Sequence, residues 1–219
     1  MALHINEIPA SAPDLTVLDD WLDIPAAIIS DELNRFGAMD GGIKPLAETA
    51  SFAGFALPVR VMPGDNAALH YAAAQAGPGM VIVIDAGGFL GSAVWGGILQ
   101  KAAEARGVHG VVVDGAIRDR AELRVAKAPV YSRGVTPNGP QKGWGGNINH
   151  PIQCGGCPVA PGDLIRGDDD GVVVVPGAMI ANVLAASRER LEMEKQIEAG
   201  IEGGKTTVEL LNLPNPEDF

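Results

Sequence analysis

Hydrophobic and polar positions along residues 81–123 change period twice, which predicts a strand, a helix and a second strand. Val81 to Ile84 and Val111 to Val113 are short runs of β-branched residues, which favour strands. Between them, apolar residues recur at helical spacing from Ala93 to Ala103, and Gly107 follows the run. This order is typical of two parallel strands joined by a crossover helix.

The predicted helix has two candidate starts. Ser92 is a candidate N-cap, which would begin the helix at Ala93. A later start at Gly96-Gly97 would leave free backbone N–H groups beside the positive end of the helix dipole, and these hold a carboxylate or a phosphate. The other interpretation of the two glycines is close packing of the helix on the sheet.

The second strand leads into a turn and a short polar motif. Arg118, Asp119 and Glu122 follow Asp114-Gly115, and the spacing of the two acids places them on one helix face. Carboxylates so placed would hold a hard cation such as Mg²⁺, directly or through water. Arg118 would present a planar fork to a substrate carboxylate or keto oxygen. Asp-x-x-Glu is also a helix capping box, and the residue types alone leave both interpretations open.

These motifs belong to a longer ordered series. WGGIL and VVVDGAIRDRAEL are followed by PVYSRGVTP, NINHPIQCGG, VAPGD and GDDDGVVVVP, over about residues 25 to 210. The series resembles the 4-hydroxy-4-methyl-2-oxoglutarate / 4-carboxy-4-hydroxy-2-oxoadipate aldolases, which share their fold with the regulator of ribonuclease E activity. The resemblance implies an α/β protein with the swivelling β/β/α fold, a mixed sheet flanked by helices, assembled as a homotrimer or homohexamer.

The resemblance also implies roles for individual residues. Arg118 and Asp119 would be catalytic, with Mg²⁺ or Mn²⁺ as the cofactor. The implied substrate-binding residues are Gly96, Gly97, Ile98 and Leu99, through their backbone amides, and Arg118. The implied metal-binding residues are Asp119, Glu122, directly or through water, and Glu194, contributed from the C-terminal helix of a neighbouring subunit.

Gly97 departs from the family pattern, because aldolase members commonly carry Asp or Glu at this position. The missing carboxylate affects proton removal more than metal binding. The implied activity is that of a class II, metal-dependent pyruvate aldolase in aromatic compound catabolism. It would cleave a 4-hydroxy-2-oxo di- or tricarboxylic acid to pyruvate and a second oxo acid, and would also decarboxylate oxaloacetate. The alternative is a non-catalytic protein-binding regulator of ribonuclease E type.

Composition limits the other function classes. The chain has 219 residues, 47% of them hydrophobic, which predicts a single domain over residues 1–219. The amphipathic C-terminal helix predicted at about 178–199 is long enough to contact a neighbouring subunit, and packing on its own sheet is the other interpretation. Sixteen basic and 27 acidic residues give a net charge of −11 without a basic cluster. We therefore expect no nucleic acid and no membrane among the partners. The first twenty residues show no signal peptide, and we expect a cytoplasmic protein.

Three further segments of the sequence are open to more than one interpretation. His150, Cys154 and Cys157 offer three zinc ligands, although Gly155-Gly156 favours a bend between strands. Asp168 to Asp170 favour a hairpin turn over a calcium loop. The glycine-rich loop 135–146, which contains Lys142 and Trp144, covers a site, forms a subunit contact or is an ordinary surface loop.

Overall fold

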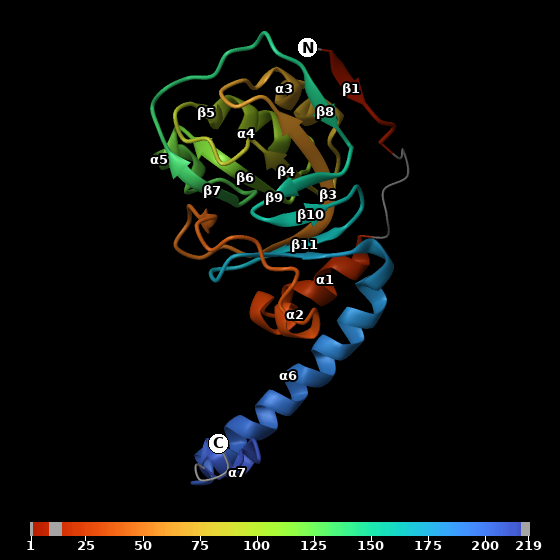
Figure 1. The fold of residues 1–219 in the computed structure, drawn as a ribbon, viewed down its shortest axis with the longest axis vertical. Coiled ribbons are helices and arrows are strands. Elements are labelled where there is room, and N and C mark those ends of the chain that lie inside the picture. The colour runs from red at the N-terminus through yellow and green to blue at the C-terminus, as the bar shows by residue number, and fades with distance from the viewer. Residues whose placement is uncertain (1, 9–14, 216–219) are drawn as a thin grey trace.

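The computed structural model describes residues 2–8 and 15–215, which form a mixed β-sheet flanked by helices (Figure 1). The strands are β1 Leu3–Ile5, β2 Lys44–Pro45, β3 Phe52–Val61, β4 Met80–Asp85, β5 Ala93–Trp95, β6 Gly110–Ile117, β7 Val130–Val135, β8 Gly146–Ile148, β9 Ile152–Cys154, β10 Cys157–Val159, β11 Leu164–Gly167 and β12 Val172–Val175. The main sheet has the order β1-β8-β3-β4-β6-β7-β2, with β11-β12 joined to β3 and β5 joined to β6.

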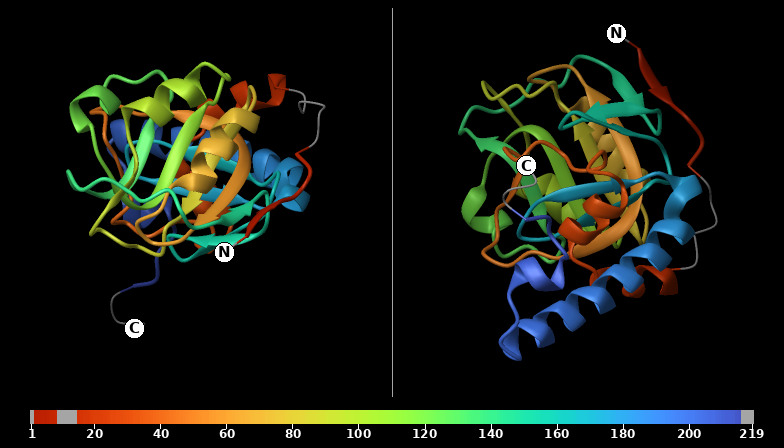
Figure 2. Two further views of the ribbon diagram at one scale, coloured as in Figure 1. Left: turned by 90° about the horizontal axis from the view of Figure 1, so that it is seen from above. Right: turned by 60° about the horizontal axis from the view of Figure 1, so that its bottom comes forward.

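The helices that pack on this sheet lie on one of its faces, and the β9-β10 hairpin lies on the other (Figure 2). The helices are α1 Thr16–Leu22, α2 Ala26–Glu32, α3 Ala67–Gln75, α4 Gly97–Glu104, α5 Arg120–Leu123, the 3-10 helix η1 Gly177–Met179, α6 Ile180–Glu202 and α7 Thr207–Leu210. Within the described residues, no helix has both the length and the apolar character that crossing a membrane requires.

The centre of the sheet confirms the predicted α/β class and the mixed sheet. β3, β4, β6 and β7 run parallel to one another, and β4 pairs with β6 in a register that sets Ile82 opposite Val111. β8, β11 and β2 add antiparallel edges. Parallel strands end at one edge of a sheet, so β4 and β6 deliver the segments that follow them to the same place.

Three apolar clusters hold the layers together. On one face of the sheet, α3 and α4 bury Leu69 and Leu99 against Ile84. On the other face, the β9-β10 hairpin packs Cys154 on Val83. α1 and α2 form a third cluster on β11 and β12 together with the start of α6. Each core strand is buried on both faces, which explains the near-continuous valine and isoleucine runs in the sequence.

Local backbone features set the ends of several elements. β8 and β9 are separate strands, because Asn149 adopts a positive φ of 60° ahead of Pro151. α5 is a short helix that ends at Leu123. The C-terminal helix extends to Glu202, and only Val183 and Ser187 of it are buried, so most of α6 projects from the body (Figure 1).

Candidate active site

The start of α4 is the first part of the candidate site. Gly96 is its N-cap, with an extended φ of −171°, and the helix begins at Gly97. The later of the two predicted starts is therefore confirmed, and the Ser92 cap is wrong. Ala93 to Trp95 form β5 instead, because these residues are buried and pair with the end of β6. The Ser92 hydroxyl donates to the carbonyl of Gly139.

Arg118 and Asp119 follow β6 and turn back towards α4. The Arg118 N–H donates to the Trp95 carbonyl, which continues the β5-β6 pairing by one residue. Asp119 adopts the left-handed conformation with a φ of 60°, which aspartate tolerates better than most residues. Its Oδ2 accepts a 2.9 Å hydrogen bond from the Gly97 N–H. Asp119 makes no side-chain cap on α5, so the capping-box interpretation is wrong.

Carboxylates approach both glycines closely. A Cβ at Gly96 would lie 2.7 Å from Oδ2 of Asp119, and a Cβ at Gly97 would overlap Oε2 of Glu122. A side chain at either position would displace a carboxylate. The glycine pair therefore brings Asp119 and Glu122 against the first turn of α4.

Lys101 is a site residue that the sequence analysis missed. Its Nζ lies 2.7 Å from Oε1 of Glu122, and this carboxylate raises the pKa of the lysine through a hydrogen bond and its charge. The spacing in the sequence could have pointed to Lys101, because Gly97 and Lys101 are four residues apart and therefore share one face of α4.

The donor set fits a hard divalent cation. The carboxylates of Asp119 and Glu122 are 42% and 45% exposed and flank the same helix start. In the described part of the chain, no group of three or more His, Cys, Asp or Glu side chains is arranged to hold a metal. Magnesium suits such a place, since it is commonly held by one or two carboxylates and keeps several waters.

A cavity of about 70 Å³ lies beside these groups. Its lining includes Gly96, Ile98, Leu99 and Arg118, so four of the predicted substrate-binding residues meet in one place. The opposite wall comes from α3 and from the loop 135–146. A wider hollow of about 680 Å³ lies between α1 and the end of α4, but it is lined by none of the predicted site residues.

The loop 135–146 forms part of the cavity wall, which agrees with the interpretation that it covers a site. A Cβ at Gly139 would lie 2.9 Å from a guanidinium nitrogen of Arg118, so the loop backbone rests on this side chain. Lys142 lines the cavity. Trp144 is not part of the lining and is 51% exposed.

Glu194 lies on α6, which Figure 1 shows well separated from α4 and α5. Arg190 pairs with Glu194 at 3.1 Å and with Asp31 on α2 at 3.6 Å. Within one chain Glu194 therefore does not reach Asp119. Its contribution to the site of a neighbouring subunit stays a prediction.

The zinc and calcium interpretations gain no support. Cys154 and Cys157 are buried in the β9-β10 hairpin, and burial raises the pKa of both thiols, which disfavours the thiolates that zinc binds. The acidic turn instead accepts backbone hydrogen bonds. Asp168 accepts from the Ala26 N–H and Asp169 from the Ala50 N–H, each at 2.7 Å.

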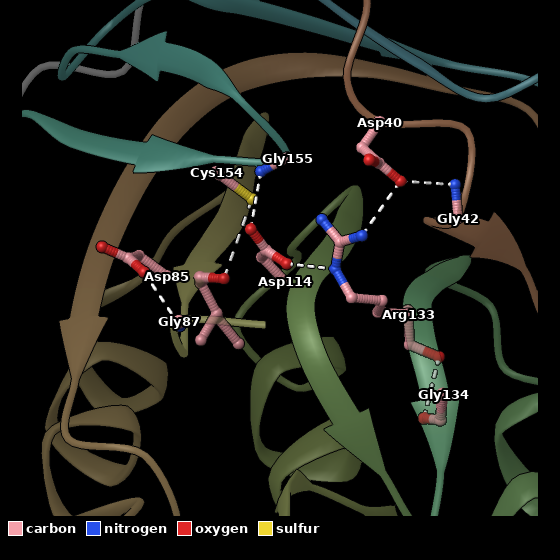
Figure 3. Close-up of polar contacts among 11 residues, drawn as sticks. Asp40, Gly42, Asp85, Gly87, Asp114, Arg133, Gly134, Cys154 and Gly155 are labelled. Carbon is pink, nitrogen blue, oxygen red and sulfur yellow. Dashed lines mark hydrogen bonds and ion pairs between the residues drawn. The ribbon is translucent and has the colours of Figure 1, made fainter. Parts of the chain in front are cut away.

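A charged network supports the end of β6 on the other face of the sheet (Figure 3). Asp114 accepts from Nε of Arg133 and from the Gly155 N–H, and Arg133 also pairs with Asp40 at 2.9 Å. The hydrogen bond from the Gly42 N–H and the charge of the Arg133 guanidinium lower the pKa of Asp40. The network connects the segment that contains Asp40, strand β7 and the β9-β10 hairpin to β6, the strand that precedes Arg118.

The chain matches known proteins in sequence and in structure. The family model described as RraA-like, Aldolase/RraA, matches residues 26–174. The chain belongs to the RraA-like family. This RraA-like chain is 41% identical over 180 residues to a Halalkalibacterium halodurans protein provisionally named 4-hydroxy-4-methyl-2-oxoglutarate aldolase. The match covers 82% of this chain and 86% of that relative.

Solved structures show the same RraA-like fold. An uncharacterized protein from Pseudomonas syringae matches with a TM-score of 0.81 at 28% identity, over 95% of this chain and 99% of the other. The structure of the RNA-processing inhibitor RraA from Thermus thermophilus matches with a TM-score of 0.65 at 32% identity. The match covers 70% of this chain and 93% of the other. The relatives thus carry two kinds of name, an aldolase and an inhibitor.

Proposed function

We propose that this protein is a divalent-metal-dependent carbon–carbon lyase. It cleaves a 4-hydroxy-2-oxo di- or tricarboxylic acid by a retro-aldol reaction to pyruvate and a second oxo acid, and it also decarboxylates oxaloacetate. The observation that carries the proposal is that Arg118 and the first turn of α4 line one cavity, while Asp119 is hydrogen-bonded to Gly97 beside it. Family membership and the aldolase-named relative support the reaction class.

The pyruvyl half of the substrate is held by Arg118 and α4. The first backbone N–H groups of a helix have no acceptor within the helix, so those of Ile98 and Leu99 remain available to a carboxylate. Arg118 lines the same cavity, and its planar fork donates to the carboxylate and the keto oxygen. Together they orient the bond next to the ketone for cleavage.

Bond cleavage leaves an electron pair on the carbon next to the ketone, which delocalises onto the keto oxygen. Arg118 stabilises that negative charge as it develops, because its donors are already in place. Asp119 and Glu122 would hold Mg²⁺ or Mn²⁺. When bound, the cation supplies a Lewis acid beside the keto group.

Gly97 bears on which reaction is faster. Retro-aldol cleavage requires a base to take the hydroxyl proton, whereas decarboxylation does not. The carboxylate that the family resemblance places at residue 97 is absent, but Glu122 fills the space beside Gly97. We assign the proton-transfer role to Glu122, and we expect oxaloacetate decarboxylation to be the less demanding of the two activities.

The test is pyruvate release, coupled to lactate dehydrogenase, with 4-hydroxy-4-methyl-2-oxoglutarate and with oxaloacetate. Turnover should require Mg²⁺ or Mn²⁺ and stop with EDTA. Arg118→Lys should raise KM more than it lowers kcat, because a point charge replaces a fork. The assignment fails when neither 2-oxo acid is turned over at any concentration of either metal.

The second candidate is a protein-binding regulator, favoured by the inhibitor named among the similar structures. A regulator acts through surface contacts, so it predicts that Arg118→Ala and Asp119→Asn leave inhibition of ribonuclease E unchanged. Those variants should abolish turnover if the protein is an enzyme. Measuring both activities on the same variants separates the two functions.

The assembly is a separate part of the proposal. We expect a homotrimer or homohexamer in which α6 places Glu194 near the metal of a neighbouring subunit. Light scattering measures the mass of the assembly in solution and so tests for a homotrimer or a homohexamer. Mixing the inactive variants Asp119→Asn and Glu194→Gln should restore part of the activity if the site is shared, since some mixed sites would then carry both wild-type residues.

A further inference from the structure

The loop 135–146 is fastened to the body of the protein at two places. At the first, the Asn138 carbonyl accepts a hydrogen bond from the Ala93 N–H at 2.9 Å. The Ser92 hydroxyl donates to the Gly139 carbonyl at 2.8 Å. These contacts hold the first half of the loop on the segment that leads into β5.

The second fastening is the carboxylate of Asp65, which is 1% exposed. Its Oδ2 accepts from the Gly143 N–H at 2.8 Å and from the Trp144 N–H at 3.1 Å. Its Oδ1 accepts from the Ala67 N–H, at the start of α3, at 2.9 Å. A buried carboxylate is costly unless donors replace its lost hydration, and these backbone N–H groups do so. One buried side chain therefore joins the second half of the loop to α3.

The loop backbone between the two fastenings lies against Arg118. A Cβ at Gly139 would lie 2.9 Å from Nη1 of Arg118. Two residues later, the Gln141 N–H donates to the Gly64 carbonyl at 2.8 Å. The ion pair from Arg118 to Asp119 is 3.7 Å long, which is too long for a hydrogen bond. The loop backbone therefore does much to limit where the guanidinium can lie.

We propose that Asp65 is a positioning residue for the lyase reaction, because it holds the loop 135–146 against the guanidinium of Arg118. Asp65 is not part of the cavity lining, so it acts through the loop and does not touch the substrate. The inference rests on the proposed function and adds a residue to it. The loop is a fixed wall of the site, and it sets how precisely the planar fork of Arg118 meets the pyruvyl carboxylate.

Two variants of Asp65 divide its bonds between the loop and α3. Serine can still accept from the Ala67 N–H, since Ser and Asp both make this local turn, but it is too short to reach the loop. Asparagine has one side-chain oxygen, which can accept from the loop while α3 loses its bond. Asp65→Ser should raise KM for the 2-oxo acid about five- to tenfold, with a smaller change in kcat. Asp65→Asn should raise KM less than about twofold. The reverse order would show that Asp65 only supports α3, and would overturn the proposal.

Coupling to Arg118 tests whether the effect passes through this side chain. Adding Asp65→Ser to Arg118→Lys should raise KM further by less than about twofold. Independent effects, in which the two single changes in KM multiply, would overturn the proposal. Asp163→Ser is the matched control, because the buried Asp163 also accepts a backbone N–H on each oxygen, from Ala160 and from Gly177, both at 2.8 Å. This control should leave KM unchanged.

Ser92→Ala keeps the proposal testable if Asp65→Ser does not fold. It removes the hydroxyl group that donates to the Gly139 carbonyl and leaves the buried carboxylate in place. Because Gly139 is the residue that rests on Arg118, KM should rise about two- to threefold. A wild-type KM in this variant would contradict the view that the loop positions Arg118.

Two measurements need no turnover. Hydrogen exchange at the Gly143 and Trp144 amides should be about tenfold faster or more in Asp65→Ser, because both lose their acceptor, and unchanged in Asp163→Ser. Calorimetry with pyruvate and Mg²⁺ should show binding about fivefold weaker in Asp65→Ser than in the wild-type protein. Unchanged exchange or unchanged affinity for pyruvate would overturn the positioning role. A wild-type protein without turnover would instead overturn the lyase assignment alone.

Discussion

The N–H of Gly97 donates a 2.9 Å hydrogen bond to the carboxylate of Asp119. This contact joins the first residue of α4 to the residue that follows the end of β6 by two positions. Because β5 and β6 are paired, the start of α4 and the segment that follows β6 lie next to each other beside the cavity.

Asp119→Asn should remove the negative charge of the side chain while keeping its size and its hydrogen bond from Gly97. Asparagine also tolerates the left-handed backbone, and its Oδ1 can keep the bond from Gly97. We expect turnover to fall by a factor of about 100 or more with the melting temperature nearly unchanged, since the metal-binding charge is lost. Asp119→Ala should lose stability too, by about 1 kcal/mol, because alanine is strained at a φ of 60°. Normal metal-dependent turnover in Asp119→Asn would remove this residue from the mechanism.

Gly97→Asp alone should impair the enzyme. The new side chain would collide with Glu122 and place a second negative charge beside it. Combining it with Glu122→Ala removes the collision, and the double variant should have a higher ratio of aldolase to decarboxylase turnover than Glu122→Ala alone, which has no carboxylate at either position. The ratio of the two initial rates is the measurement. An unchanged ratio would show that a carboxylate at residue 97 does not favour the aldol reaction.

Lys101→Met should tighten binding of the metal. The ammonium now pairs with Glu122 and competes with a cation for that carboxylate. We expect the Mg²⁺ concentration for half-maximal activity to fall about two- to fivefold, in line with an exposed ion pair. Lys195→Met is the matched control, since Lys195 pairs with Glu192 on α6. A higher Mg²⁺ requirement would mean that Lys101 orients Glu122 instead.

Asp114→Asn should destabilise the fold, because the amide removes the charge that pairs with the half-buried Arg133 and cannot accept from both Nε of Arg133 and the Gly155 N–H. We expect a loss of about 3 kcal/mol in the free energy of unfolding, measured with urea. Asp40→Asn removes the more exposed partner of the same arginine and should cost much less. Similar losses in the two variants would contradict the view that Asp114 is the centre of the network in Figure 3.

Asp85→Asn should change how stability depends on pH. Burial raises the pKa of Asp85 in the folded protein, so between the unfolded and folded pKa values the native state binds more protons. Stability from this group therefore rises as pH falls through that window, and at neutral pH its charged form is a cost. The amide should raise stability at neutral pH and flatten the acid side of the profile. Unfolding followed from pH 3 to 7 measures both effects.

The sequence indicated the strand–helix–strand unit and its neighbours because local patterns carry that information. β-branched runs such as Val111 to Val113 are buried on both faces, and glycines mark where the elements end. The same patterns pointed to Arg118 and Asp119 as a polar end. Element boundaries do not follow from the sequence where apolar residues suit either a helix or a strand. Ala93 to Trp95 form a strand because β6 pairs with them.

Only the tertiary structure decided which distant groups meet at the cavity. Asn66 and Lys142 are 76 positions apart, and nothing in their local sequence links them to Arg118. They come together because Asp65 accepts hydrogen bonds from the loop that carries Lys142. Local periodicity reports which face of an element is buried, whereas contacts between elements depend on how the whole sheet and its loops close.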